Sequence, residues 1–213
     1  MVNSILGRYE APALQWFCRR IPPFVVPNHL TLLGLGGGII VFVGFALSNL
    51  DIAYLWFVIF GLFLNWVGDS LDGSLARFRG CERRKYGYFT DHMTDAITMT
   101  LVGVGASLSP YLSSVSSLSV LIAYLLLTLF SALEAKVRGD MRIAFGNVGP
   151  TEFRIVLGIL VVFVFFFPDA AIHAWGESWN LYDAILLAMA ASMMTVCVFS
   201  ALSVGRELSH EDP

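Results

Sequence analysis

The sequence contains little charge. Only 14% of its 213 residues are Asp, Glu, Lys or Arg, whereas an ordinary soluble domain contains about 25%. Hydrophobic residues make up 57% of the chain, and the mean hydropathy is +0.73. This composition excludes a disordered chain and a nucleic-acid-binding protein, and it argues against a soluble enzyme. We therefore expect a protein of the membrane.

Cysteine is also scarce. The three cysteines, Cys18, Cys81 and Cys197, are an odd number, lie far apart and form no CxxC pair. The pattern predicts neither a disulfide framework nor a zinc site. The sequence also lacks a repeat of 20 to 50 residues and a low-complexity segment, so we expect one domain.

Six apolar segments approach the length of about 20 residues that a membrane-spanning helix needs. The fifth segment is long enough only if its helix begins at Pro150, a residue suited to the first helical turn. The predicted spans are 28–48, 52–68, 87–109, 112–133, 150–168 and 184–205.

Residues 4–20 precede these spans and are too polar to cross a bilayer. They are typical of an amphipathic interfacial helix, with Trp16 and Phe17 facing lipid and Arg19 and Arg20 facing water. The predicted fold class is therefore all-α and integral to the membrane, with six transmembrane helices preceded by an interfacial helix. We divide the chain into residues 1–26, containing this helix, and residues 27–213, forming the six-span domain.

The positive charges predict the orientation. Every Lys and Arg lies before the first span, between the second and third, at or between the fourth and fifth, or after the sixth, and the other three connections have none. Such a partition indicates that both termini lie in the cytoplasm. The 13 residues are Arg8, Arg19, Arg20, Arg77, Arg79, Arg83, Arg84, Lys85, Lys136, Arg138, Arg142, Arg154 and Arg206.

Four aspartates lie on the second and third predicted spans, where charge is costly and therefore indicates function. Asp69 and Asp72 are spaced i and i+3, and Asp91 and Asp95 are spaced i and i+4, so each pair shares one helix face. Asp69 or Asp72 alone could be an exposed helix-end residue, and Asp91 or Asp95 alone could cap a helix or pair with Arg77 or Arg84, but these readings do not explain two facing pairs.

Because these two helices are joined by a short segment, we expect them to be antiparallel neighbours with their acidic faces together. Two divalent cations would neutralise four carboxylates, and oxygen ligands favour Mg²⁺ or Mn²⁺ over zinc. Such a pair of ions is typical of phosphoryl transfer.

The stretch GDSLDGSLARFRGCERRKYGYFTDHMTD resembles the signature of the CDP-alcohol phosphotransferase (CDP-alcohol phosphatidyltransferase) family. The resemblance implies a membrane enzyme of phospholipid biosynthesis. Such an enzyme transfers a phospho-alcohol group from a CDP-linked donor to an acceptor hydroxyl and releases CMP. The fixed positions are Asp69, Asp72, Gly73, Ala76, Arg77, Gly87, Asp91 and Asp95.

The resemblance also implies roles for these residues. The four aspartates would hold the two cations, and Asp95 would also act as the general base. The nucleotide-binding candidates are Asn28, Thr31, Gly73, Ala76, Arg77 and Gly87. Arg138 and Arg154 are candidates for the acceptor or head group because guanidinium groups match phosphate oxygens, although both also fit the charge rule for topology. We expect a homodimer, which Gly103, Gly105 and Ala106 would permit.

Two branches of the family remain open. CDP-diacylglycerol could donate a phosphatidyl group to a small alcohol, and this branch is favoured because short six-span chains are common in it. Alternatively, a CDP-linked amino alcohol could donate its head group to a lipid hydroxyl. The pair Asp91-His92 and the run Gly149-Pro150-Thr151-Glu152 resemble this choline and ethanolamine branch. A carboxylate-lined cation or proton-coupled transporter is the alternative of another class.

Overall fold

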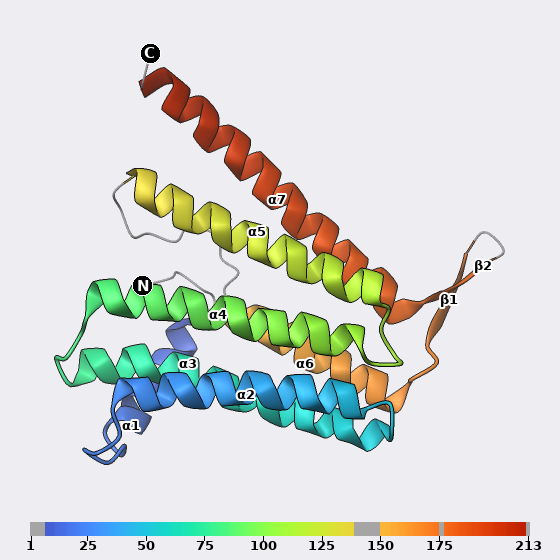
Figure 1. The fold of residues 1–213 in the computed structure, drawn as a ribbon, viewed down its shortest axis with the longest axis horizontal. Coiled ribbons are helices and arrows are strands. Elements are labelled where there is room, and N and C mark those ends of the chain that lie inside the picture. The colour runs from blue at the N-terminus through green and yellow to red at the C-terminus, as the bar shows by residue number, and fades with distance from the viewer. Residues whose placement is uncertain (1–6, 139–149, 175–176, 212–213) are drawn as a thin grey trace.

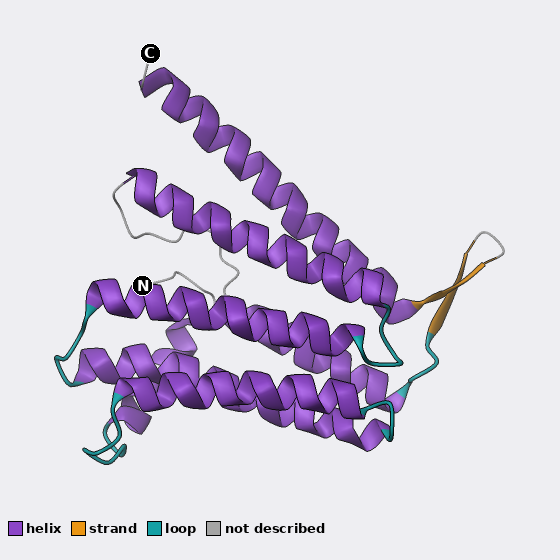
Figure 2. Cartoon of the chain, in the orientation of Figure 1, coloured by secondary structure: helices purple, strands orange, loops and turns teal. Residues whose placement is uncertain are grey.

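A computed structural model describes residues 7–138, 150–174 and 177–211, and Arg142 and Gly149 lie outside this part of the chain. The described residues form long helices and one small hairpin (Figures 1 and 2). In chain order the elements are α1 (Gly7–Cys18), α2 (Pro27–Leu47), the 3₁₀ turn η1 (Ile52–Tyr54), α3 (Leu55–Phe78), α4 (Arg84–Ser107), α5 (Ser114–Arg138), α6 (Pro150–Phe166), β1 (Ala171–Ala174), β2 (Glu177–Asn180) and α7 (Leu181–Glu211). Each predicted span coincides with a helix, and α6 begins at Pro150 as expected.

Four of these helices are long and apolar enough to cross a membrane: α2, η1 with α3, α5 and α7. The other two predicted spans, α4 and α6, are not among these long apolar helices. α6 has 17 residues, and α4 includes Arg84, Lys85, Asp91 and Asp95. The four long apolar helices make the chain an integral membrane protein.

Helix α2 packs against both α3 and α4, and these two helices approach each other less closely than either approaches α2. Glycines bring α2 and α3 together. A Cβ atom at Gly37 would lie 2.5 Å from the amide nitrogen of Asn65, and one at Gly68 would lie 2.3 Å from the amide nitrogen of Gly34. Only glycine fits these contacts, so Gly37 and Gly68 allow the two helices to pack closely.

The small residues of α4 pack against other helices of the same chain. Added side-chain atoms at Gly103 would meet Leu121 of α5, and at Gly105 they would meet Phe42 of α2. Ala106 is also buried. These three residues therefore do not form a surface for a second copy, contrary to the suggestion from the sequence.

Polar contacts fasten α5, α6 and α7 at the end of the bundle that carries the hairpin. Asp183 of α7 accepts hydrogen bonds from the Ser113 amide at 2.8 Å and from the Ser116 hydroxyl at 2.5 Å. The Tyr182 hydroxyl donates to the carbonyls of Phe163 and Phe167, at 3.0 and 2.6 Å. These bonds fix the start of α7 against both neighbouring helices.

No pattern in the sequence predicts the antiparallel pair β1 and β2. It pairs Ala171 with Asn180 and Ala174 with Glu177. The hairpin projects from the bundle between α6 and α7 (Figure 2).

Helix α1 lies against α3. The Trp66 indole donates a 3.0 Å hydrogen bond to Glu10, and Cys18 is buried with Leu71 and Leu75. Trp16 and Phe17 remain exposed, at 50% and 44%. The helix therefore keeps an apolar outer surface, as an interfacial helix would.

Arg79 joins α3 to the segment that follows α1. Its guanidinium donates hydrogen bonds to four backbone carbonyls of the segment that leads into α2. The accepting residues are Ile21, Pro22, Pro23 and Val25. Five donors on one planar group suit this task, and a lysine could not reproduce it.

Candidate metal centre

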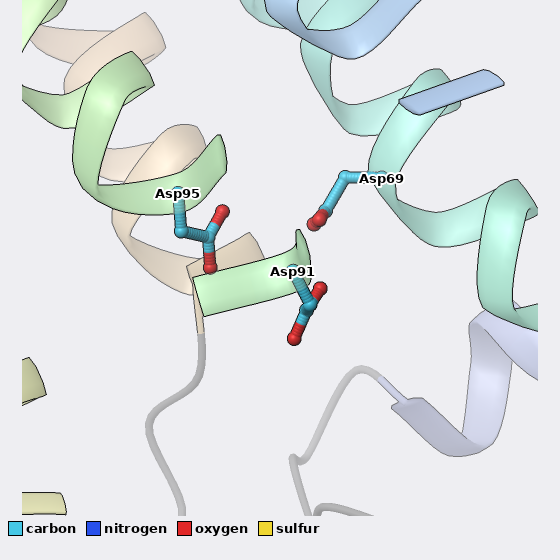
Figure 3. A group of neighbouring side chains, drawn as sticks. All are labelled: Asp69, Asp91 and Asp95. Atoms are coloured by element: carbon cyan, nitrogen blue, oxygen red, sulfur yellow. The ribbon is translucent and has the colours of Figure 1, made fainter. Parts of the chain in front are cut away.

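Three of the four predicted aspartates converge between α3 and α4. Asp69 on α3 faces Asp91 and Asp95 on α4 (Figure 3). One carboxylate oxygen from each lies within 4.8 Å of the others. Helix α2 packs against both α3 and α4 and so supports both acidic faces.

The three carboxylates differ in exposure. The side chain of Asp91 is 49% exposed, whereas those of Asp69 and Asp95 are 20% and 19% exposed. Asp91 is therefore the exposed member of the cluster, and Asp69 and Asp95 are its more buried members.

Arg154 of α6 holds the two buried carboxylates. Its guanidinium lies 2.7 Å from Asp69 and 3.3 Å from Asp95, and the residue is only 6% exposed. The Nε atom of Arg154 is buried without a hydrogen-bond partner among the described residues. Two ionic contacts with the acidic cluster thus compensate the buried charge of Arg154.

Asp72 lies beside the cluster and faces α2. It accepts hydrogen bonds from the Thr31 hydroxyl at 2.6 Å and from the Gly73 amide at 2.5 Å. Asp72 also lines a small polar pocket together with Asp69 and Asp95. The predicted aspartates therefore share one site, with Asp72 on its α2 side.

The nucleotide candidates lie around the same end of α2, α3 and α4. Asn28 donates a 3.1 Å hydrogen bond to the Tyr86 hydroxyl, joining the starts of α2 and α4. Arg77 is exposed and bonds to Ser74. A Cβ atom at Gly73 would meet the Arg77 guanidinium at 3.4 Å.

Two further candidates are small residues. Ala76 is partly buried on α3, and Gly87 on α4 is exposed with nothing within 4 Å of an added Cβ atom. Space is therefore available beside α4 at Gly87.

Arg138 is the last residue of α5 and forms ion pairs with glutamates outside the acidic cluster. Its guanidinium lies 3.0 Å from Glu134 and 2.6 Å from Glu207 of α7. These ion pairs join α5 to α7, so any role for Arg138 with the acceptor stays a prediction.

Tyr124 of α5 was not identified from the sequence. Its ring contacts Phe153 at a centroid distance of 5.6 Å, and the residue is close enough to Asp95 and Arg154 to interact with their charges. An isolated tyrosine in an apolar helix gives no sequence signal, because its position beside the aspartates depends on how α5 packs against α4.

The donor chemistry of the cluster fits a hard divalent cation. Carboxylate oxygens are the ligands that Mg²⁺ and Mn²⁺ prefer, whereas no histidine nitrogen or cysteine sulfur joins this group among the described residues. His92 adjoins Asp91 but turns its Nδ1 atom toward the Tyr88 carbonyl at 3.0 Å.

The helices and this site define an integral membrane protein with an acidic centre between two of its helices. A sequence model of the CDP-alcohol phosphatidyltransferase family matches residues 24–198. The chain belongs to this family.

Curated relatives include cholinephosphotransferase 1 of Homo sapiens, which is 27% identical over 153 residues. That match covers 69% of this chain and 37% of the human protein. Cholinephosphotransferase 1 of Gallus gallus is 27% identical over 168 residues, which cover 75% of this chain and 49% of the relative. The chain thus spans less than half the length of these relatives.

Among solved structures, the fold resembles that of the Mycobacterium tuberculosis phosphatidylinositol phosphate synthase PgsA1. The structure with CDP-DAG bound aligns with a TM-score of 0.61 and 20% identity, covering 90% of each chain. The apo form also aligns with a TM-score of 0.61. This likeness extends over nearly the whole bundle and concerns the fold.

Proposed function

We propose that this protein transfers a phospho-alcohol group from a CDP-linked donor to an acceptor hydroxyl and releases CMP. The observation that carries the proposal is the convergence of Asp69, Asp91 and Asp95 within 4.8 Å, in the stretch that bears the family's fixed positions. Acidic side chains in a membrane protein are costly unless they serve a ligand.

The four aspartates would hold two divalent cations, with Asp69, Asp72 and Asp91 as ligands and Asp95 shared between metal binding and proton transfer. When bound, such cations would neutralise the donor diphosphate and stabilise charge on the departing CMP. The all-oxygen ligand set favours Mg²⁺ or Mn²⁺.

In the proposed reaction, the acceptor oxygen forms a bond to the phosphorus that carries the donor alcohol. The bond from this phosphorus to the bridging oxygen breaks, and CMP leaves with that oxygen and its electron pair. Asp95 accepts the proton of the acceptor hydroxyl. Because the chemistry needs little beyond alignment and charge, the main task of the site is positioning.

Arg154 supports this arrangement through its contacts with Asp69 and Asp95. Its fork geometry keeps both carboxylates in place, and it can also receive a phosphate oxygen of the reacting group. Arg138 remains a weaker candidate for the acceptor or head group because Glu134 and Glu207 already neutralise it.

The nucleotide would lie on the side of the site formed by α2 and α3. Thr31 contacts Asp72 directly, and Gly73 and Arg77 follow on the next turns of α3. Asn28, Ala76 and Gly87 complete the nucleotide candidates at this end of the helices.

For the membrane arrangement, we propose six spans, α2 to α7, with α1 lying at the interface. Residues 1–26 would form the interfacial part and residues 27–213 the catalytic domain. The positive charges favour a cytoplasmic site and cytoplasmic termini. A homodimer is our expectation from the family resemblance, and light scattering of the purified protein measures it.

The test is a panel of radiolabelled CDP-linked donors and hydroxyl acceptors, given to the purified protein in lipid nanodiscs with Mg²⁺. We expect CMP and a phospholipid product to appear in equal amounts, and EDTA to stop both. Asp95→Asn should abolish CMP release while keeping donor binding. Asp169→Asn changes an exposed aspartate far along the chain from the cluster and is the matched control.

Wild-type protein that releases no CMP from any donor would refute the proposal. Retained turnover in Asp95→Asn would remove only Asp95 from the mechanism. Isothermal titration with CDP-alcohols, with Mg²⁺ and then with EDTA, separates this enzyme from a transporter, since a transporter has no reason to bind the nucleotide.

A further inference from the structure

The connection between α1 and α2, residues 19–26, lies at the same end of the bundle as the turn that joins α3 to α4 (Figure 1). Pro22 and Pro23 lie within it, and Pro27 is the first residue of α2. Each proline fixes its own φ angle and restricts the residue before it, so the connection is stiff. A displacement of this connection therefore moves the first turn of α2.

Arg79 holds the connection with both terminal nitrogens of its guanidinium. Each nitrogen donates to two backbone carbonyls, at N–O distances from 2.5 to 3.4 Å, and the accepting residues are Ile21, Pro22, Pro23 and Val25. Each terminal nitrogen of a guanidinium has two hydrogens, so every terminal N–H is engaged and none is left for a phosphate of the donor. Arg79 therefore acts on the backbone of the connection.

The start of α2 lacks a side-chain cap. Its N-cap residue is Val26, which is extended and makes no side-chain hydrogen bond. A Ser, Thr, Asp or Asn at this position commonly fixes the first turn through a side-chain oxygen, which valine does not have. The position of the first turn thus depends on the connection before it and on the contacts of its own residues with α3 and α4.

Two nucleotide candidates lie on the first turns of α2. Asn28 donates a 3.1 Å hydrogen bond to a tyrosine hydroxyl on α4, and Thr31 donates a 2.6 Å hydrogen bond to Asp72 on α3. Asn28 lies only three residues after Val25, whose carbonyl accepts from Arg79. Arg79 follows Asp72 by seven residues, which is about two helical turns. One end of α3 therefore fixes the start of α2 at two points, at Asp72 and at Arg79.

We propose that Arg79 is a positioning residue for the nucleotide, because it holds the connection that places Asn28 and Thr31 beside the acidic centre. The inference rests on the proposed function. Arg79 lies outside the fixed positions of the signature and, with its terminal N–H groups engaged, binds no donor phosphate. A misplacement of about 1 Å in a reacting site can cost about a hundredfold in rate, so a residue that contacts no reactant can still control the binding of the donor.

Three substitutions separate the geometry of Arg79 from its charge. Arg79→Met removes the four hydrogen bonds together with the charge. Arg79→Lys keeps the charge, but an ammonium donates from a single nitrogen and cannot reproduce the two pairs of bonds. Arg84→Met is the matched control, because Arg84 is an exposed arginine at the start of α4 and its replacement removes the same charge.

The experiment measures donor binding and turnover in purified protein. CDP-choline and CDP-diacylglycerol are titrated separately, with Mg²⁺ and without acceptor, and KM and kcat are then measured with the donor that wild type turns over. We expect Arg79→Met and Arg79→Lys each to raise the Kd and the KM of the donor about tenfold, with a smaller change in kcat. Arg84→Met should stay within about twofold of wild type, because solvent and salt screen an exposed charge.

Three results would overturn the proposal. Donor binding by Arg79→Lys that equals wild type would show that charge alone suffices. Equal losses in Arg79→Met and Arg84→Met would show the same. A lower kcat with unchanged KM and Kd of the donor would show a structural role only, because loss of folded protein lowers kcat alone.

A double-mutant cycle tests whether Arg79 acts through α2. Asn28→Ala should weaken donor binding in wild type but add little to Arg79→Met, because Asn28 is already displaced in that variant. Additive losses would contradict this route. Hydrogen–deuterium exchange of residues 24–31 should rise in both Arg79 variants and not in Arg84→Met, and equal exchange in all three would contradict the hold of Arg79 on the connection.

The binding measurements need no turnover, so the two proposals can fail separately. Wild type that binds a donor but releases no CMP would refute the proposed reaction, and the binding comparison would still decide the role of Arg79. Wild type that releases CMP, while all three variants bind the donor alike, would refute the role of Arg79 and leave the reaction standing.

Discussion

Replacing Arg154 tests how the acidic cluster is neutralised. Arg154→Met keeps an apolar side chain of comparable length but leaves Asp69 and Asp95 without their 2.7 and 3.3 Å ionic contacts. Removing one partner of a buried pair costs about 3–5 kcal/mol. Because both carboxylates are about one-fifth exposed, we expect the lower end, about 3 kcal/mol.

For a chain of this size, 1 kcal/mol corresponds to about 2–4 °C in melting temperature. We therefore expect Arg154→Met to melt about 6–12 °C below wild type in detergent with EDTA. Saturating Mg²⁺ should raise the melting temperature of Arg154→Met more than that of wild type and so reduce this loss, because the two carboxylates have lost their cationic partner and bind the ion more tightly. The assay is a thermal unfolding scan of both proteins with EDTA and with Mg²⁺.

Arg138→Met is the matched control. Arg138 also contacts two carboxylates, Glu134 and Glu207, but its side chain is 39% exposed. Exposed ion pairs contribute little, so this variant should lose much less melting temperature than Arg154→Met, and its difference from wild type should be the same with Mg²⁺ as with EDTA. Equal losses for the two variants, or an Arg154→Met loss that Mg²⁺ does not reduce, would refute the role given to Arg154.

Two other predictions concern packing and thiol reactivity. Gly68→Ala should destabilise the bundle and weaken cation binding at Asp69, because the new Cβ atom would meet the α2 backbone at 2.3 Å. Gly36→Ala should do neither, because an added Cβ atom there meets nothing within 4 Å. Melting scans with and without Mg²⁺ compare the two variants. Burial raises the pKa of the Cys18 thiol, which is 3% exposed, so at pH 8 a maleimide should modify exposed Cys81 well before Cys18. Mass spectrometry of the digested protein measures both thiols, and equal rates would contradict the burial of Cys18 between α1 and α3.

Much of the helical architecture follows from local sequence. Apolar runs and Pro150 predict the helices, and the i, i+3 and i, i+4 spacings predict which faces carry the aspartates. The two acidic faces converge because α3 and α4 both pack against α2, rather than through direct packing of α3 on α4. That detail depends on Gly37 and Gly68, whose close contacts with the opposite helix no local pattern specifies.

The partners of the site residues depend on tertiary packing and could not be predicted. Arg154 is 85 residues from Asp69 and 59 from Asp95 in the chain. The sequence names Arg154 as a candidate for binding phosphate, but its carboxylate partners follow from the packing of α6 against α3. The four-residue strands β1 and β2 are likewise too short for an alternating pattern to predict them.

Electron paramagnetic resonance of Mn²⁺ bound to the purified protein, in the presence of a CDP-linked donor, tests the acidic centre most directly. We predict two bound ions per chain with spin coupling, because paired catalytic metals lie about 3.5–4 Å apart. Asp69→Asn and Asp91→Asn should each abolish the coupled signal. A wild-type protein that binds no Mn²⁺, or binding that both substitutions leave unchanged, would contradict the assignment of this cluster as the metal centre.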